Sequence, residues 1–327
     1  MAFAQTSFDF VSTGRKLTYV SAVAVIISLG SLLINSLELG LDFTSGSLVE
    51  VGYSEPVAVP EISAQLAAAG YEEAQVVAFG SDQDILIRMP VDESLSEVEM
   101  ASQLVVLGEN LLSTLQAGTS AEVEIRRMEF VGPRVGEELA ESGGMGILVS
   151  LGMVMLYVGA RFQSKFAIAA VLGLMHDVIL TLGVFSLARL QFDLTVLAAV
   201  LAIIGYSVND KIVVFDRVRE NFRVLRKGTP AELINISLNQ TLSRTTITSG
   251  TTLLVVLAML FAGGDSIKGF ATALTLGIII GTYSSIYVGS TLLLMMKVTK
   301  EDLIAPPKES EADSLPCSFR SAHGLCQ

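Results

Sequence analysis

The sequence from residue 194 to residue 215 reads LTVLAAVLAIIGYSVNDKIVVF. A helix needs about 20 consecutive, mostly apolar residues to cross a bilayer, and this run has that length and character. Its only charged residues, Asp210 and Lys211, are adjacent and follow a short polar stretch. The run therefore predicts a transmembrane helix that carries polar groups on part of its surface.

Five more apolar runs occur in this chain of 327 residues, of which 51% are hydrophobic and whose mean hydropathy is +0.60. The first run follows Arg15 and Lys16 and lacks the short core and small-residue cleavage site of a removable signal peptide, so we expect it to remain as an anchor. The fold class that follows is a membrane all-α six-helix bundle. Its predicted transmembrane helices are residues 17–37, about 144–158, 166–187, 194–215, 246–262 and 267–296.

Charge is distributed unevenly along the chain, whose formal net charge is −12. Residues 38–142 contain 20 acidic and 4 basic residues, a net of −16, whereas residues 211–244 contain 3 acidic and 7 basic residues, a net of +4. Short loops rich in Lys and Arg stay in the cytoplasm. The sequence therefore predicts a cytoplasmic N-terminus at 1–16, a cytoplasmic tail at 297–327, and a periplasmic domain at 38–142.

The periplasmic segment 38–142 alternates between strand and helix patterns. The order strand, helix, strand, strand, helix, strand is typical of a ferredoxin-like α+β domain, here inserted between the first two transmembrane helices. The last strand begins with a charged stretch at 122–126, which we interpret as a solvated sheet surface rather than a binding surface. The predicted strands are 47–53, 75–79, 85–89 and 122–131, and the predicted helices are 60–69 and 96–115.

The polar tail contains the only cysteines, Cys317 and Cys326, with His323 between them. Their spacing matches no zinc or redox motif, so we predict a disordered tail without a metal site. The sequence also has no phosphate-binding Gly-x-x-x-x-Gly-Lys loop, no HExxH and no nucleophile elbow. We therefore expect no cofactor and no covalent catalysis.

Asp210 is the first candidate for a functional residue, because an ionisable group inside a bilayer costs roughly 2.5–3.5 kcal/mol on insertion scales. Tyr206 and Ser207 precede it by four and three residues and so share its helix face, while Asn209 adds to the polar stripe. One interpretation is a carboxyl group that binds and releases protons. The other is an interfacial Asp at the helix end, paired with Lys211, and spacing alone leaves both open.

Three further groups of polar or small residues fall in predicted transmembrane helices or directly before one. Arg244 opens the fifth predicted helix and leads into hydroxyl residues that include Thr248, which either line a wet path or follow a positive-inside anchor. His176 and Asp177 lie in the middle of the third, where we favour a buried hydrogen-bonded pair over a proton relay. Gly277 and Gly281 predict close helix packing, against a partner that the sequence does not identify.

Several motifs resemble those of SecF proteins, which are protein-export subunits. SecF proteins form part of the SecD/SecF family, within the resistance-nodulation-division superfamily. The most specific is GYSVNDKIVVFDRVREN at residues 205–221, and the segment LGLDFTSGSLVEV at 39–51 resembles the motif that follows the first transmembrane helix. The VGPRVGEEL segment at 131–139, the His176–Asp177 pair and the hydroxyl run at 243–252 also match. The resemblance covers nearly all of residues 17–296.

The resemblance implies a function. It implies an inner-membrane subunit that joins SecD, associates with the SecYEG channel and with YajC-type and YidC-type proteins, and uses the proton motive force to assist late export of an unfolded polypeptide. It implies that Asp210 and Arg244 take part in proton passage. It implies no nucleic-acid partner.

Two residues depart from the family pattern. Lys211 stands where the resemblance leads us to expect a small hydroxyl residue, usually Thr, and Ser45 replaces the first Gly of a Gly-Gly pair. Because adjacent residues face different sides of a helix, we expect the Lys211 side chain to snorkel to the membrane interface rather than to act on Asp210.

Two alternative functions remain open at the level of sequence. One is a proton-coupled exporter of small molecules or lipids, which would use the same kind of ionisable groups within the membrane. With one set of six helices and one external domain, such an exporter would need a partner chain. A scaffold subunit that conducts nothing is the other alternative. Replacement of Asp210 by Asn discriminates between scaffolding and proton coupling.

Overall fold

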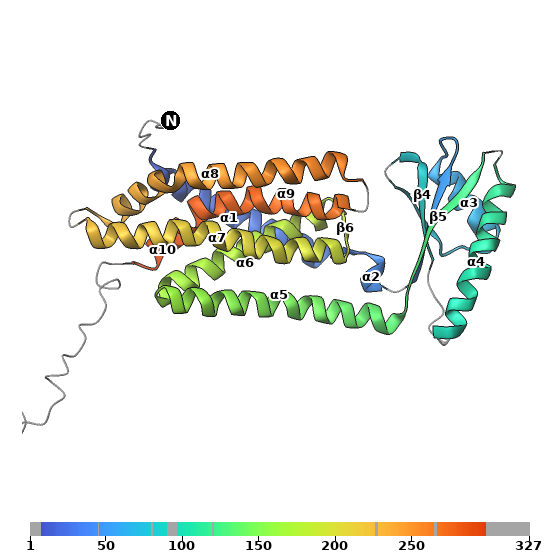
Figure 1. Cartoon of the computed structure of the whole chain (residues 1–327), viewed down its shortest axis with the longest axis horizontal. Helices are drawn as coiled ribbons and strands as arrows, with labels where there is room; N and C mark the ends of the chain where they lie inside the picture. The colour runs from blue at the N-terminus through green and yellow to red at the C-terminus, as the bar shows by residue number, and fades with distance from the viewer. Residues whose placement is uncertain are drawn as a thin grey trace, which may run out of the picture.

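The computed structural model describes residues 8–44, 46–79, 81–89, 97–119, 121–225, 228–264 and 267–298. Figure 1 shows an elongated molecule in which a helical bundle carries a small sheet domain at one end. Most of the predicted tail, including both cysteines and His323, lies outside the described residues. The membrane helical bundle and the small sheet region that the sequence predicts are thereby confirmed.

Six helices in the described residues are long and apolar enough to cross a membrane. The six helices differ in how they compare with the predicted apolar runs. Five begin before or end after their run, because polar residues continue the helix there, but the first ends at Ile34 rather than at residue 37 and the last lies within the predicted 267–296. The six are α1 (Phe10–Ile34), α5 (Pro133–Arg161), α6 (Ser164–Leu187), α7 (Leu194–Val224), α8 (Pro230–Ala262) and the segment Lys268–Met295.

The start of α8 corrects one prediction. Thr229 accepts a hydrogen bond from the backbone of Glu232, whose side chain in turn accepts one from the backbone of Thr229, so a capping box begins the helix at Pro230. Arg244 was expected to open this helix, and it lies well inside it instead. A membrane-length apolar run marks only the hydrocarbon part of a helix and not its true ends.

The last transmembrane segment is not a uniform α-helix. It consists of α9 (Lys268–Tyr283), a short π-helical turn η2 (Ser284–Val288), and α10 (Gly289–Met295). The hydroxyl of Tyr283 donates to the carbonyl of Leu17 and accepts from Ser21, which holds this region against α1.

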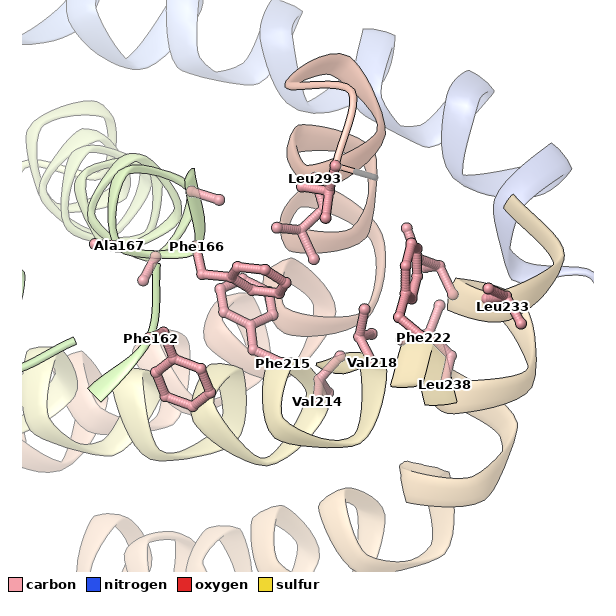
Figure 2. Packing of buried hydrophobic residues seen from close by; sticks show 14 of the residues in the cluster. Phe162, Phe166, Ala167, Val214, Phe215, Val218, Phe222, Leu233, Leu238 and Leu293 are labelled. Atoms are coloured by element: carbon pink, nitrogen blue, oxygen red, sulfur yellow. The ribbon is translucent and has the colours of Figure 1, made fainter. Parts of the chain in front are cut away.

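The core at the end of the bundle far from the sheet domain is aromatic and aliphatic. Phe166 of α6 meets Phe215 of α7 edge-on, with ring centroids 5.6 Å apart, and stacks on Phe162 at 6.1 Å. Figure 2 shows how Phe222 and Leu293 extend this cluster toward α8 and α10. Dispersion contacts of this kind fix the helix order in a membrane, where lipid offers no hydrophobic penalty to separation.

In the described residues, the sheet domain has four antiparallel strands in the order β3-β4-β2-β5. Alternate residues of the central strand β2, such as Val49 and Val51, are fully buried against Leu66 of α3 and Leu111 of α4. Both helices therefore pack on one face of the sheet. Its elements are β2 (Gly46–Tyr53), α3 (Val59–Ala68), β3 (Gln75–Phe79), β4 (Ser81–Met89), α4 (Glu97–Ala117) and β5 (Val123–Val131).

A small junction connects the sheet domain to the bundle. The strand β1 (Glu38–Leu39) pairs in parallel with β6 (Gln191–Phe192), directly before α7, and the short helix α2 (Leu41–Thr44) follows β1. Asp42 accepts a hydrogen bond from the backbone N–H of Leu194 at 2.9 Å, and so caps the first turn of α7 from outside the helix.

Candidate functional site

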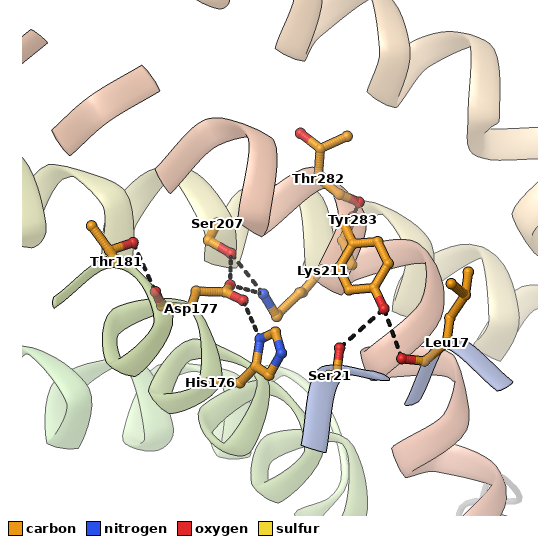
Figure 3. Close-up of polar contacts among 10 residues, drawn as sticks. Leu17, Ser21, His176, Asp177, Thr181, Ser207, Lys211, Thr282 and Tyr283 are labelled. Atoms are coloured by element: carbon orange, nitrogen blue, oxygen red, sulfur yellow. Dashed lines mark hydrogen bonds and ion pairs between the residues drawn. The ribbon is translucent and has the colours of Figure 1, made fainter. Parts of the chain in front are cut away.

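A buried polar cluster lies between α6 and α7, and Figure 3 shows its side chains converging on Asp177. The Nζ of Lys211 is 2.7 Å from Oδ2 of Asp177, which also accepts a hydrogen bond from Ser207 at 2.6 Å. Nδ1 of His176 is 2.9 Å from the other carboxylate oxygen. Asp177 and Lys211 are both fully buried. The cluster therefore contains an ion pair that is removed from solvent and lipid.

The position of Lys211 corrects the expectation that it snorkels. Its side chain points into the bundle, where the carboxylate of Asp177 pairs with the ammonium group. A snorkelling lysine would instead place its ammonium group at the membrane interface. The sequence rule that neighbours on a helix face different sides is satisfied, since Lys211 faces α6 and Asp210 faces α8. The assumption that failed was that this side faces the membrane.

Asp210 lies in a second cluster, between α7, α8 and α9. Its side chain is 3% exposed, and Oδ2 accepts a hydrogen bond from Ser249 of α8 at 3.3 Å. Thr282 of α9 donates to the Ser249 hydroxyl at 2.8 Å. Within the part of the chain that the structure describes, no cation forms an ion pair with Asp210. The predicted alternative, an interfacial Asp paired with Lys211, is therefore wrong, because Lys211 binds Asp177 instead.

The other predicted polar residues have different surroundings. Ser207 was expected to share the helix face of Asp210, but its hydroxyl donates a hydrogen bond to Asp177 of α6 instead. The Tyr206 hydroxyl is buried and has no hydrogen-bond partner among the described residues. Asn209 and Arg244 are exposed at the surface of this chain, and Thr248 is half-buried one residue before Ser249.

The glycines of α9 bring that helix close to α7. A Cβ atom at Gly277 would lie 2.3 Å from side-chain carbons of Ile203, and one at Gly281 would lie 3.0 Å from the Ser207 hydroxyl. The packing partner that the sequence left unidentified is therefore internal. Close approach of α9 is what allows Thr282 to reach the neighbourhood of Asp210.

The two clusters differ in the chemistry that they allow. Asp177 has a cation and two further polar neighbours, a set that holds a carboxylate charged in a low-dielectric interior. Asp210 has one neutral hydroxyl neighbour, so it can change between charged and neutral forms without breaking an ion pair. Among the described residues, no three His, Cys, Asp or Glu side chains converge as metal ligands.

Sequence reasoning missed Ser249, Thr282 and the pairing of Lys211 with Asp177. The sequence did contain a signal for this pair. Asp177 lies in the middle of the predicted helix 166–187, where a carboxylate requires a partner, and Lys211 is a cation inside the neighbouring predicted helix 194–215. Ser249 and Thr282 sit among several equivalent hydroxyl residues, so only the packing of α8 and α9 selects them.

Two family models match the chain. The one described as protein export membrane protein SecD/SecF, C-terminal, matches residues 111–299, and the SecD/SecF GG motif matches residues 30–57. A protein translocase subunit SecF from Pseudomonas aeruginosa is 48% identical over 311 residues, which cover 95% of this chain and 98% of the relative. A subunit of the same name from Escherichia coli O157:H7 is 40% identical, with 94% of each chain covered.

Solved structures match as well. The crystal structure of SecDF, described as a translocon-associated membrane protein from Thermus thermophilus, is 36% identical with a TM-score of 0.80, over 91% of this chain. A SecDF crystal structure in a super-membrane-facing form gives a TM-score of 0.67 at 38% identity. In both cases the chain spans only 40% of the solved SecDF chain.

Proposed function

This chain belongs to the SecF family and is an accessory subunit of the Sec protein translocase, and from that premise we propose that it uses the proton motive force to assist late steps of export. The observation that carries the proposal is Asp210, a buried carboxyl group whose one hydrogen-bond partner among the described residues is the hydroxyl of Ser249. Such a group can bind and release a proton within the membrane. A proton crossing 100 mV releases about 2.3 kcal/mol, so a few protons per cycle suffice to bias a domain rearrangement.

The proposed path runs between α7 and α8. Arg244 lies on the same helix as Ser249, five residues earlier, and supplies a positive charge near the cytoplasmic side of Asp210. Thr248, Tyr206 and Asn209 add polar groups along the two helices, where water molecules can be held. Asp210 is the proton carrier in this scheme. The positive charge of Arg244 stabilises the carboxylate of Asp210 after the proton has left.

The proposed topology places both termini in the cytoplasm and the sheet domain in the periplasm, with the bundle in the bacterial inner membrane. The C-terminal ends of α5 and α7, which carry Arg161, Arg219 and Arg223, lie at the end of the bundle opposite the sheet domain (Figure 1). This distribution supports the orientation by the positive-inside rule. The strand order β3-β4-β2-β5 supports a ferredoxin-like class for the periplasmic domain.

The proposed partners are SecD, the SecYEG channel, an unfolded exported polypeptide, and YajC-type and YidC-type proteins. The relatives named protein translocase subunit SecF, and the longer SecDF chain described as translocon-associated, support an assembly larger than this chain. In such an assembly, SecD supplies the part of the SecDF fold that this chain lacks. No covalent catalysis is required of the subunit.

The proposal is tested in membrane vesicles that contain this chain, SecD and the channel, by measuring gradient-dependent release of a secreted polypeptide. Asp210→Asn keeps the size of the side chain and removes its ability to carry a proton, so gradient-dependent release is expected to fall to the level seen without a gradient. Release is compared at matched amounts of assembled complex.

The matched control is Asp216→Asn, on the same helix. Asp216 is exposed and faces Arg161 at 3.4 Å across the surface, where an ion pair contributes about 0–1 kcal/mol. The control variant should release substrate as the native protein does. Native release by Asp210→Asn would leave the chain a translocase subunit but would reject proton coupling through this residue.

A further inference from the structure

The ion pair between Lys211 and Asp177 forms a closed set of bonds. Ser207, one turn before Lys211, accepts a hydrogen bond from Nζ at 2.6 Å and donates one to the same carboxylate oxygen that Lys211 contacts. His176 occupies the second carboxylate oxygen. Both oxygens of Asp177 and two of the three Nζ protons of Lys211 are therefore used inside the bundle.

The surrounding helices leave room for this arrangement. A Cβ atom at Gly173, one turn before Asp177 on α6, would lie 2.5 Å from Cε of Lys211, so the lysine stem crosses α6 at a glycine. A Cβ atom at Gly281 of α9 would lie 3.0 Å from the Ser207 hydroxyl and 3.8 Å from Asp177. The site is thus shaped on two sides to hold the lysine in one place.

Lys211 and Asp210 are adjacent on α7, and adjacent side chains project about 100° apart around a helix. The first contacts α6 and the second contacts Ser249 of α8. Any rotation of α7 about its axis that moves Lys211 from Asp177 also moves Asp210 from α8. A buried ion pair resists such rotation strongly, because separation leaves two uncompensated charges in a low-dielectric interior.

We propose that Lys211 is a positioning residue, whose ion pair with Asp177 fixes the rotation of α7 and thereby holds Asp210 against α8. The inference rests on the proposed function only in taking Asp210 as a proton carrier. The claim that the ion pair fixes the rotation of α7 does not depend on that function. Asp177 in this arrangement is a fixed counter-ion for Lys211, and its role is separate from that of Asp210.

The rotation is measured with a disulfide across α7 and α8, in a chain whose Cys317 and Cys326 are replaced by serine. Asn221 of α7 donates to the Ser237 hydroxyl of α8 at 2.7 Å, so Asn221→Cys and Ser237→Cys place two thiols face to face. Asn221 follows Asp210 by about three full turns and lies on the same side of α7. The rate of disulfide formation therefore reports whether that side faces α8.

Three variants are compared with the native pair: Lys211→Met, Asp177→Asn, and both together. Each single variant leaves one buried charge without a partner and should lower the melting temperature of the purified protein, whereas the double variant should recover most of that loss. Disulfide formation should slow in Lys211→Met and stay slow in the double variant, because no ion pair fixes α7 in either. Native disulfide rates in the double variant would overturn the proposal.

Export provides the second readout, at matched amounts of assembled complex. Gradient-dependent release should fall roughly tenfold or more in the double variant, as expected when a reacting group is misplaced by about 1 Å, while gradient-independent release is unchanged. Full release by the double variant beside a defective Asp210→Asn would reject the positioning role alone. Full release by Asp210→Asn would reject the proposed function, and the disulfide rates would then decide the geometric claim by themselves.

Discussion

At the scale of single residues, the bundle treats two adjacent charges on α7 in opposite ways. Lys211 is paired with a carboxylate, a serine hydroxyl and a helix surface opened by glycine, whereas Asp210 has one hydroxyl within hydrogen-bonding distance. Burial penalises both charges, but among the described residues only Lys211 forms an ion pair that offsets the penalty. The carboxyl group without an ion pair is the one suited to gain and lose a proton.

Gly173→Ala tests the tight fit of the lysine. The added Cβ would lie 2.5 Å from Cε of Lys211, whose Nζ is held by two bonds and cannot move away freely. We expect a loss of about 1–3 kcal/mol, as overpacking of a core typically costs, measured by thermal unfolding in detergent. Gly146→Ala on α5, where a Cβ meets nothing within 4 Å, is the control. Equal melting temperatures for the two variants would contradict the described packing.

At the scale of helices, α7 is the central element of the bundle. It contacts α6 through the ion pair, α8 through Ser249 and Ser237, and α9 through the glycines. Small residues on α9 let the two backbones approach closely, which compensates in a membrane for the missing hydrophobic driving force. The position of α9 therefore determines whether Thr282 reaches the Asp210 cluster.

Gly277→Ala should weaken the contact between α7 and α9, because its Cβ would overlap Ile203 at 2.3 Å. The loss should again be about 1–3 kcal/mol by thermal unfolding. Adding Ile203→Ala removes the three atoms nearest to the new Cβ. The double variant should therefore lose less stability than the sum of the losses in Ile203→Ala and Gly277→Ala. Simple additivity of the two losses would show that the helices do not touch at this point.

The elements themselves were largely predictable, whereas their contacts were not. Apolar run length predicts six membrane helices, but the start of α8 depends on a capping box at Thr229 and Glu232 that hydropathy does not detect. The polar stripe around Asp210 was visible in the sequence. Which neighbour each polar side chain meets depends on helix rotation, and for that reason Ser207 and Lys211 were assigned to the wrong surroundings.

At the scale of the whole molecule, the sheet domain is joined to the helix that carries Asp210. The strand β1 pairs with β6 immediately before α7, Phe43 stacks on Phe192 with centroids 5.7 Å apart, and Asp42 caps Leu194. The same helix therefore receives the external domain at one end and holds the candidate proton carrier near its middle. A rearrangement of either part has a direct mechanical route to the other.

Asp42→Ala should loosen this junction. Loss of a side-chain cap costs about 0.5–2 kcal/mol of helix stability, and Asp193 remains as the intrinsic cap of α7. Hydrogen exchange at the first turn of α7 should therefore become faster, while exchange around Asp210 is unchanged. Glu38→Gln, which removes an exposed ion pair with Arg189 in the same junction, is the control. Identical exchange in the two variants would argue against a capping role for Asp42.

The central claim, that protons pass through this subunit by way of Asp210, is tested most directly by proton flux. Liposomes that contain this chain with SecD, and a pH-sensitive dye inside, are given a pH gradient, and the initial rate of internal pH change is recorded. The native protein should pass protons faster than Asp210→Asn, whose rate should equal that of liposomes without protein, while Asp216→Asn matches the native rate. Equal proton flux in the native protein and Asp210→Asn would contradict the claim.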